Sequence, residues 1–98
     1  MIDLSGKIKM RQLSDMLRIP WIDVDVALAM VHPLQITNTR WYDKREACAA
    51  LETYYTAKAE LNREKYRQTG TETYRRRERT CAERLARIRE YLAELEAT

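Results

Sequence analysis

The sequence predicts a mainly helical protein: a small winged-helix-like head with a short β-hairpin, followed by an antiparallel two-helix hairpin. The chain of 98 residues has only two glycines and two prolines, and 34% of its residues are charged, a composition typical of helices. Short, broken apolar segments before residue 43 give way to two long stretches of helical periodicity after it. We therefore expect residues 1–42 to form the head and residues 43–98 the helical hairpin, packed together as one domain.

The head should begin with a short strand at residues 8–10, where apolar and basic residues alternate. Helical spacing follows at once, because residues 13–17 place three apolar side chains on one face. Pro20 disfavours helix geometry at Ile19, so this first helix should end by Arg18.

A second helix is expected from Pro20 or Trp21 to Val31, just before a His-Pro pair. Its apolar side chains fall on two nearly opposite faces: Ile22, Val26, Ala29 and Met30 on one, and Val24, Leu28 and Val31 on the other. One face should pack in the head's own core. The other should be covered either by the long helices or by a partner chain.

Residues 34–42 predict a small β-hairpin with its turn at Thr37-Asn38-Thr39, because asparagine tolerates the left-handed conformation that tight turns need. Directly after it, Asp43 is a good N-cap residue. Glu46, three positions later, completes a pattern that resembles a capping box. The third helix should therefore start at this point.

Gly70 is expected to end the third helix, and Thr69 or Thr71 to cap the fourth. The fourth helix has apolar residues at alternating spacings of four and three, typical of a coiled-coil seam: Cys81, Leu85, Ile88, Leu92 and Leu95. Because the connection is short, the two helices should be antiparallel, with facing residue numbers that sum to about 140. In that register Cys48 and Cys81 lie too far apart for a disulfide.

Little in the sequence points to catalysis. Cys48 or Cys81 could in principle pair with the only histidine, His32, but both cysteines lie on packing stripes, so we expect no enzyme. We also expect no metal site, no cofactor and no small-molecule substrate, since ligand spacings and glycine-rich phosphate loops are missing. The sequence has neither an apolar run of membrane-spanning length nor a secretory leader, which predicts a cytoplasmic protein.

The predicted element order is that of a winged helix-turn-helix. The segments 10–28 and 39–47 resemble the heads of MerR-type regulators, phage excisionases and phage small terminase subunits. In these families an arginine and a tyrosine of the wing precede an acidic residue that opens the next helix, as Arg40, Tyr42 and Asp43 do here. The resemblance covers about residues 8 to 51 and implies a DNA-binding protein.

The first functional hypothesis is therefore a phage or mobile-element regulator or accessory factor that binds double-stranded DNA. Its expected DNA contacts are Arg18, Arg40, Lys44 and Arg45. The second helix would be the recognition helix, yet it carries Asp23 and Asp25 and no basic residue, whereas base edges and phosphates require basic or amide side chains. The formal net charge of +3 permits nucleic-acid binding without requiring it.

The alternative hypothesis is a protein-interaction module, such as an adaptor or a phage protein that blocks a host complex. Under either hypothesis a homodimer is expected, through apolar surface of the second helix or the hairpin. The expected interface residues are Trp21, Val24, Leu28, Tyr54 and Tyr91. A cluster of arginines serves either hypothesis by contacting phosphate or an acidic partner: Arg75, Arg76 and Arg79. These arginines could instead pair with nearby glutamates on a solvated helix face.

Overall fold

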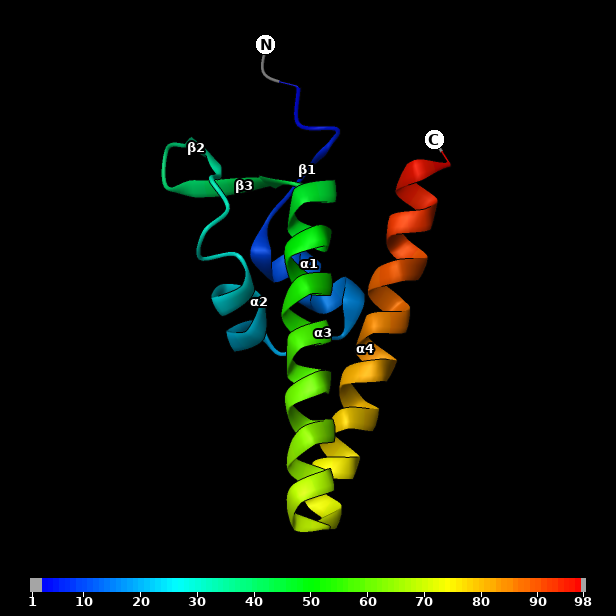
Figure 1. The fold of residues 1–98 in the computed structure, drawn as a ribbon. Helices are drawn as coiled ribbons and strands as arrows, with labels where there is room; N and C mark the ends of the chain where they lie inside the picture. Colours follow the sequence, from blue (N-terminus) through cyan, green and yellow to red (C-terminus); the bar gives the residue numbers. More distant parts are fainter. Residues whose placement is uncertain (1–2, 98) are drawn as a thin grey trace.

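The computed structural model describes residues 3–97 and confirms the predicted fold class. A small antiparallel sheet and two short helices precede two long helices that run side by side, one up and one down (Figure 1). The elements are β1 (Lys7–Ile8), α1 (Met10–Leu17), α2 (Trp21–Ala27), β2 (Leu34–Ile36), β3 (Thr39–Asp43), α3 (Lys44–Thr69) and α4 (Glu72–Glu96). The molecule is 55 Å long because the α3–α4 hairpin extends well past the head.

The sheet has the order β1-β3-β2, and both pairings are antiparallel. Strand β1 is shorter than the sequence predicts, because Met10 is already the first residue of α1. The side chain of Gln12 caps this helix by accepting a hydrogen bond from the Lys9 amide. In the β2–β3 hairpin, which we call the wing, the positive φ of 51° falls on Thr37 and not on the asparagine that follows it.

Helix α1 ends as expected at Arg18, which adopts the left-handed conformation with φ 54°. The turn into α2 is fixed by Ser14, whose hydroxyl donates a 2.6 Å hydrogen bond to the carbonyl of Ile19. Helix α2 is shorter than predicted and stops at Ala27. The chain there tightens into turns, in which the amide of Val31 bonds to the carbonyl of Leu28 before the chain reaches Pro33.

The long hairpin starts and turns where the sequence predicts. Asp43 caps α3 by accepting a 3.0 Å hydrogen bond from the Glu46 amide, and Gly70 ends the helix with φ 67°. The predicted antiparallel register is confirmed by ion pairs between α3 and α4 whose residue numbers sum to about 141: Arg63–Glu78, Glu52–Arg89 and Arg45–Glu96.

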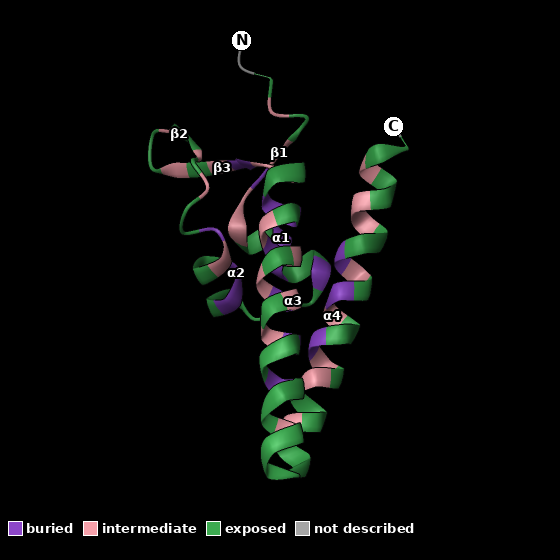
Figure 2. Ribbon diagram, viewed as in Figure 1, coloured by how far each residue is buried: buried purple, intermediate pink, exposed green. Residues whose placement is uncertain are grey.

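The core lies at the level of the head, where α1, α2 and the sheet pack on the hairpin (Figure 2). Its largest fully buried side chains include Leu13, Leu51, Tyr55 and Ile88. Beyond the head the hairpin is mostly exposed (Figure 2). At the opposite end α4 diverges from α3, so the last two seam residues, Leu92 and Leu95, are only partly buried (Figure 1).

Candidate interaction surfaces

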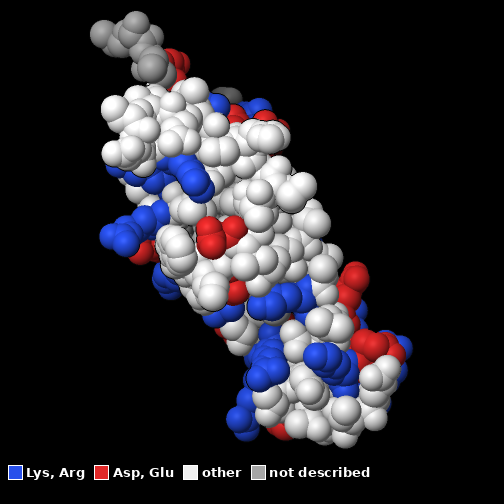
Figure 3. Space-filling view, turned by 90° about the vertical axis from the view of Figure 1, so that its left-hand side faces the viewer, with Lys and Arg blue, Asp and Glu red and all other residues white. Residues whose placement is uncertain are grey.

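The outer face of α2 is apolar and open to solvent. We call this surface the α2 face; it is formed by Trp21, Ile22, Asp25 and Val26 of α2 and by Ala29 and Met30 of the turn that follows. Its largest apolar side chains are highly exposed: Trp21 by 51%, Ile22 by 65%, Val26 by 56% and Met30 by 90%. Figure 3 looks onto this side of the molecule and shows a broad neutral area with an acidic spot near its centre. Soluble monomers rarely gather so many exposed apolar side chains in one place.

A shallow hollow of about 600 Å³ separates the α2 face from the wing. Asp25 and Val26 line it from α2, and Gln35 and Arg40 line it from the two strands of the wing. The exposed Arg40 side chain makes no hydrogen bond or ion pair within residues 3–97, so its charge is free to meet a partner. The hollow thus places one acidic and one basic side chain beside exposed apolar surface.

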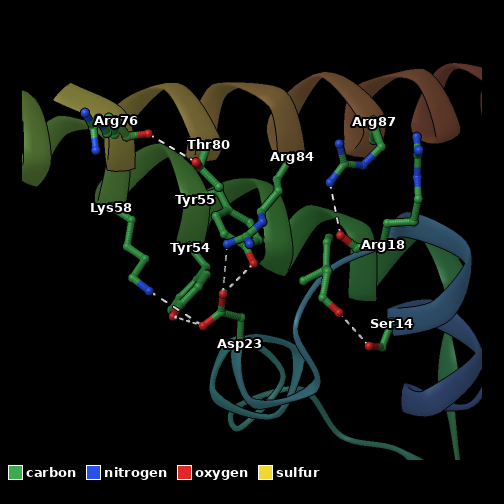
Figure 4. Close-up of polar contacts among 11 residues, drawn as sticks. Ser14, Arg18, Asp23, Tyr54, Tyr55, Lys58, Arg76, Thr80, Arg84 and Arg87 are labelled. Carbon is green, nitrogen blue, oxygen red and sulfur yellow. Dashed lines mark hydrogen bonds and ion pairs between the residues drawn. The ribbon is translucent and has the colours of Figure 1, made fainter. Parts of the chain in front are cut away.

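The inner side of α2 is held by a buried carboxylate, Asp23 (Figure 4). Its two oxygens accept hydrogen bonds from the hydroxyls of Tyr54 at 2.9 Å and Tyr55 at 2.7 Å. Lys58 and Arg84 approach the same carboxylate at 3.6 and 3.5 Å. We call this cluster the Asp23 network, and it joins α2 to both long helices.

The Asp23 network keeps its carboxyl group ionised. Burial alone would raise the pKa of Asp23, but the hydrogen bonds from Tyr55 and Tyr54 and the charges of Lys58 and Arg84 together hold it below its ordinary value. For the same reasons, burial and the neighbouring Asp23 charge raise the pKa of Tyr55 well above that of a free tyrosine. The Asp23 carboxylate is therefore the acceptor of the network, and the two tyrosine hydroxyls are its donors.

A second polar contact fixes the end of α1 against α4. The guanidinium of Arg87 donates a hydrogen bond to the carbonyl of Arg18 at 3.0 Å (Figure 4). It donates a second one to the carbonyl of Leu17 at 2.7 Å. These carbonyls have no partner inside α1, because a helix leaves its last carbonyls unbonded. With the Asp23 network, this contact fixes the orientation of the head on the hairpin.

The four residues predicted to contact DNA do not form one surface. Arg18 lies beside Arg87 in a hollow between α1 and α4, whereas Arg40 lies on the wing. Lys44 and Arg45 border a different hollow near the end of α4, where Arg45 donates a hydrogen bond to the Leu95 carbonyl. A single duplex docked on the wing would therefore meet Arg40 before the other three.

The predicted interface residues also separate into different environments. Val24 and Leu28 are fully buried in the chain's own core, so the expectation that they meet a partner is corrected. The apolar side of α2 that stays uncovered is the opposite one. Tyr54 donates a hydrogen bond to Asp23, and Tyr91 of α4 is partly buried against the core. Of the five predicted interface residues, only Trp21 lies on the exposed α2 face.

The arginine cluster is divided by the hairpin. Arg75 and Arg79 line a hollow on one side of α3–α4, and Arg76 lines a hollow on the other. Glu78, which the sequence places close to these arginines, instead pairs with Arg63 of α3 at 2.6 Å. The predicted site residues did not include three other cations on the Arg76 side, Lys58, Arg77 and Arg84. The antiparallel register of the hairpin, applied to the basic residues of both helices, would have placed them on one side.

The thiols belong to the core. Cys48 and Cys81 are both free and buried, and burial raises the pKa of the Cys48 thiol to about 11. At neutral pH such a thiol is almost entirely protonated and is a poor nucleophile. Within residues 3–97, no group of three or more potential ligand side chains is arranged to hold a metal ion.

No helix in the described part of the chain combines the length and apolar character that crossing a bilayer requires. Comparisons with protein-family models, with curated proteins and with solved structures found no match to this chain.

Proposed function

We propose that this chain is a non-enzymatic protein-interaction module that contacts its partner through the α2 face. One observation carries the proposal: Ile22 and Val26, one turn apart on α2, and Met30, in the turn that follows the helix, are all more than half exposed. Fully burying an aliphatic side chain of this size contributes about 1.5–3 kcal/mol. Three such side chains and the neighbouring Trp21 supply the apolar centre that protein interfaces need.

The same face is poorly suited to reading DNA. Its only charged residue is Asp25, which would meet the negative phosphates of a duplex. Base edges in the major groove are read mainly by arginine, lysine, asparagine and glutamine, and the exposed residues of α2 include none of these. The geometry thus favours protein contact, the alternative hypothesis from the sequence, over sequence reading by α2.

DNA contact by the wing is the second candidate function, and Arg40 favours it. This side chain is exposed on β3, is free of other ion pairs among residues 3–97, and belongs to an element order typical of winged helices. In this version a phage or mobile-element accessory factor would hold duplex DNA by wing-to-phosphate contact, with α2 turned to a protein partner or to a second copy of the chain.

Photo-crosslinking tests the first candidate. The protein is produced with a photoreactive phenylalanine analogue in place of Met30, in the cells in which it naturally occurs. The matched control carries the analogue at Glu90, an exposed residue of α4. We expect a discrete protein adduct from position 30 that disappears when Val26→Glu is added. An adduct of twice the chain's mass would identify the partner as a second copy. A nucleic-acid adduct, or the same adducts from both positions, would refute protein contact by the α2 face.

Arg40→Ala tests the second candidate by fluorescence anisotropy with a generic duplex. If the wing holds DNA, the variant should bind weakly, while Arg45→Ala, whose side chain is held at the end of α4, should bind as the unaltered protein does. Equal binding by both variants and the unaltered protein would exclude the wing as the contact.

A further inference from the structure

The two sides of the α3–α4 hairpin carry their charges differently. On one side a groove of about 520 Å³ is lined by five basic residues and by no acidic residue. We call it the basic groove, and its cations are Lys58, Lys65, Arg76, Arg77 and Arg84. Figure 3 shows basic side chains gathered over the lower half of the molecule, where the hairpin extends past the head.

The opposite side of the hairpin carries acidic as well as basic residues. Its hollow is lined by four arginines together with Glu60 and Glu78. Two of these arginines form ion pairs between the helices: Arg63 with Glu78 at 2.6 Å, and Arg89 with Glu52 at 2.9 Å. Paired surface charges of this kind are the ordinary decoration of a solvated helix face. The lining of the basic groove has no acidic residue of its own, so like charges repel one another along it.

The cations of the basic groove differ in their availability. Lys58 and Arg84, at the end nearest the head, share Asp23 (Figure 4). Lys65, Arg76 and Arg77, farther along, make no ion pair within residues 3–97. The ammonium of Lys65 and the guanidinium of Arg77 both lie over the ring of Tyr74, at 5.5 and 5.7 Å from its centre. Both cations thus lie over the same aromatic ring.

The register sets the spacing of these charges. Lys65 faces Arg76, and Lys58 faces Arg84, because facing residue numbers sum to about 141. The two levels are seven residues apart on α3, which corresponds to about 10 Å at 1.5 Å per residue. Phosphates follow one another every 3.4 Å along each strand of a duplex, so this length covers about three phosphates.

We propose that the basic groove binds the phosphodiester backbone of a nucleic acid. The two levels of cations would follow a run of phosphates, and the uncompensated Lys65, Arg76 and Arg77 would make the contacts at the level farther from the head. The spacing of the two levels matches a regular phosphate series, which favours a nucleic acid over an acidic protein segment. This site lies on the hairpin and is separate from the α2 face, so the chain would hold a nucleic acid at one end and a protein at the other.

Anisotropy titrations with labelled duplex DNA and with single-stranded DNA, each of about 20 nucleotides per strand, test the site over a salt series. Three phosphate contacts predict a slope of about −2.7 for log K against log salt on duplex, and hence about 40-fold weaker binding at 200 mM than at 50 mM salt. The double variant Arg76→Ala/Arg77→Ala should lower the slope to about −0.9 and weaken binding at least about tenfold at low salt.

The matched control is Arg75→Ala/Arg79→Ala, which removes two exposed arginines of the same helix from the opposite side. It should keep the affinity and the slope of the unaltered protein, and Val26→Glu on the α2 face should do the same, which separates this site from the proposed protein contact.

Three results would overturn the proposal. Equal losses in the two double variants would mean that overall charge, and not the groove, attracts DNA. A loss confined to Arg40→Ala would place the contact on the wing. Competition by polyglutamate of equal charge, as effective as DNA itself, would point to an acidic protein as the ligand.

Discussion

Replacing Asp23 with asparagine removes the negative charge at the centre of the contacts between α2 and the hairpin while keeping the side chain's size. The carboxylate accepts one tyrosine hydroxyl at each of its two oxygens, at 2.9 and 2.7 Å. Asparagine has only one oxygen acceptor, so one of these hydrogen bonds is lost and the other becomes neutral. We therefore expect Asp23→Asn to destabilise the fold.

The magnitude follows from the contacts. A hydrogen bond to a charged group contributes about 1.5–3 kcal/mol, and a charged bond is roughly twice as strong as a neutral one. The ion pair with Lys58 adds little, because 43% of that side chain is exposed and water screens the charge. The loss should thus be about 3 kcal/mol, which lowers the Tm of a domain of this size by about 12–24 °C.

Thermal and urea unfolding followed by circular dichroism measure this loss. Asp25→Asn is the matched control, since it makes the same change on the exposed side of the same helix and should alter stability by less than about 0.5 kcal/mol. A double-mutant cycle with Tyr55→Phe should show coupling, because both changes remove the same 2.7 Å hydrogen bond. An Asp23→Asn protein that melts within about 4 °C of the unaltered one would refute the reasoning.

Three further predictions concern acid, the hairpin turn and the thiols. Folding holds the pKa of Asp23 below its ordinary value, so the stabilisation that the carboxylate gives is present above about pH 4 and is lost as the pH falls through the folded-state pKa. Between about pH 5 and pH 2 the unaltered protein should therefore lose more stability than Asp23→Asn, as measured by urea titrations. Parallel losses in the two proteins would contradict this prediction. Gly70→Ala should lower the free energy of unfolding by about 1–2 kcal/mol, because φ is 67° at this position. Gly6→Ala is the control and should lower it far less, since Gly6 has no positive φ and open space around it. Equal melting temperatures of the two variants would contradict the turn geometry. Cys48 and Cys81 should react with a thiol reagent at pH 8 only as fast as the protein opens, and rapid native-state labelling would show that they are not buried as described.

Local chemistry explains what the sequence predicted well. The cap at Asp43 and the stop at Gly70 depend on one or two residues each, and the structure places both as expected. The antiparallel register follows from a short connection and an apolar seam, and the Arg63–Glu78 pair confirms it. In each case the residues that decide the feature are neighbours along the chain or on one helix face.

Tertiary packing decides what the sequence could not supply. The periodicity of α2 shows two apolar faces, but only the packing of the head selects Val24 for the core and leaves Val26 in solvent. Asp23 looked like a surface charge because its partners Tyr55 and Arg84 lie on two distant helices. Helical rotation likewise assigns consecutive arginines such as Arg75 and Arg76 to opposite sides, which a count of charges does not reveal.

Lys58 and Arg84 serve two neighbours at once, since they line the basic groove and also hold the carboxylate of α2. A polyanion in the groove would draw these cations away from Asp23 and loosen the seating of α2. Thermodynamic reciprocity then requires that a protein bound to α2 change the groove's affinity by the same factor. Through the shared carboxylate of Asp23, binding at the groove would thereby change the affinity of the α2 face for its partner, and binding at the α2 face would change the affinity of the groove.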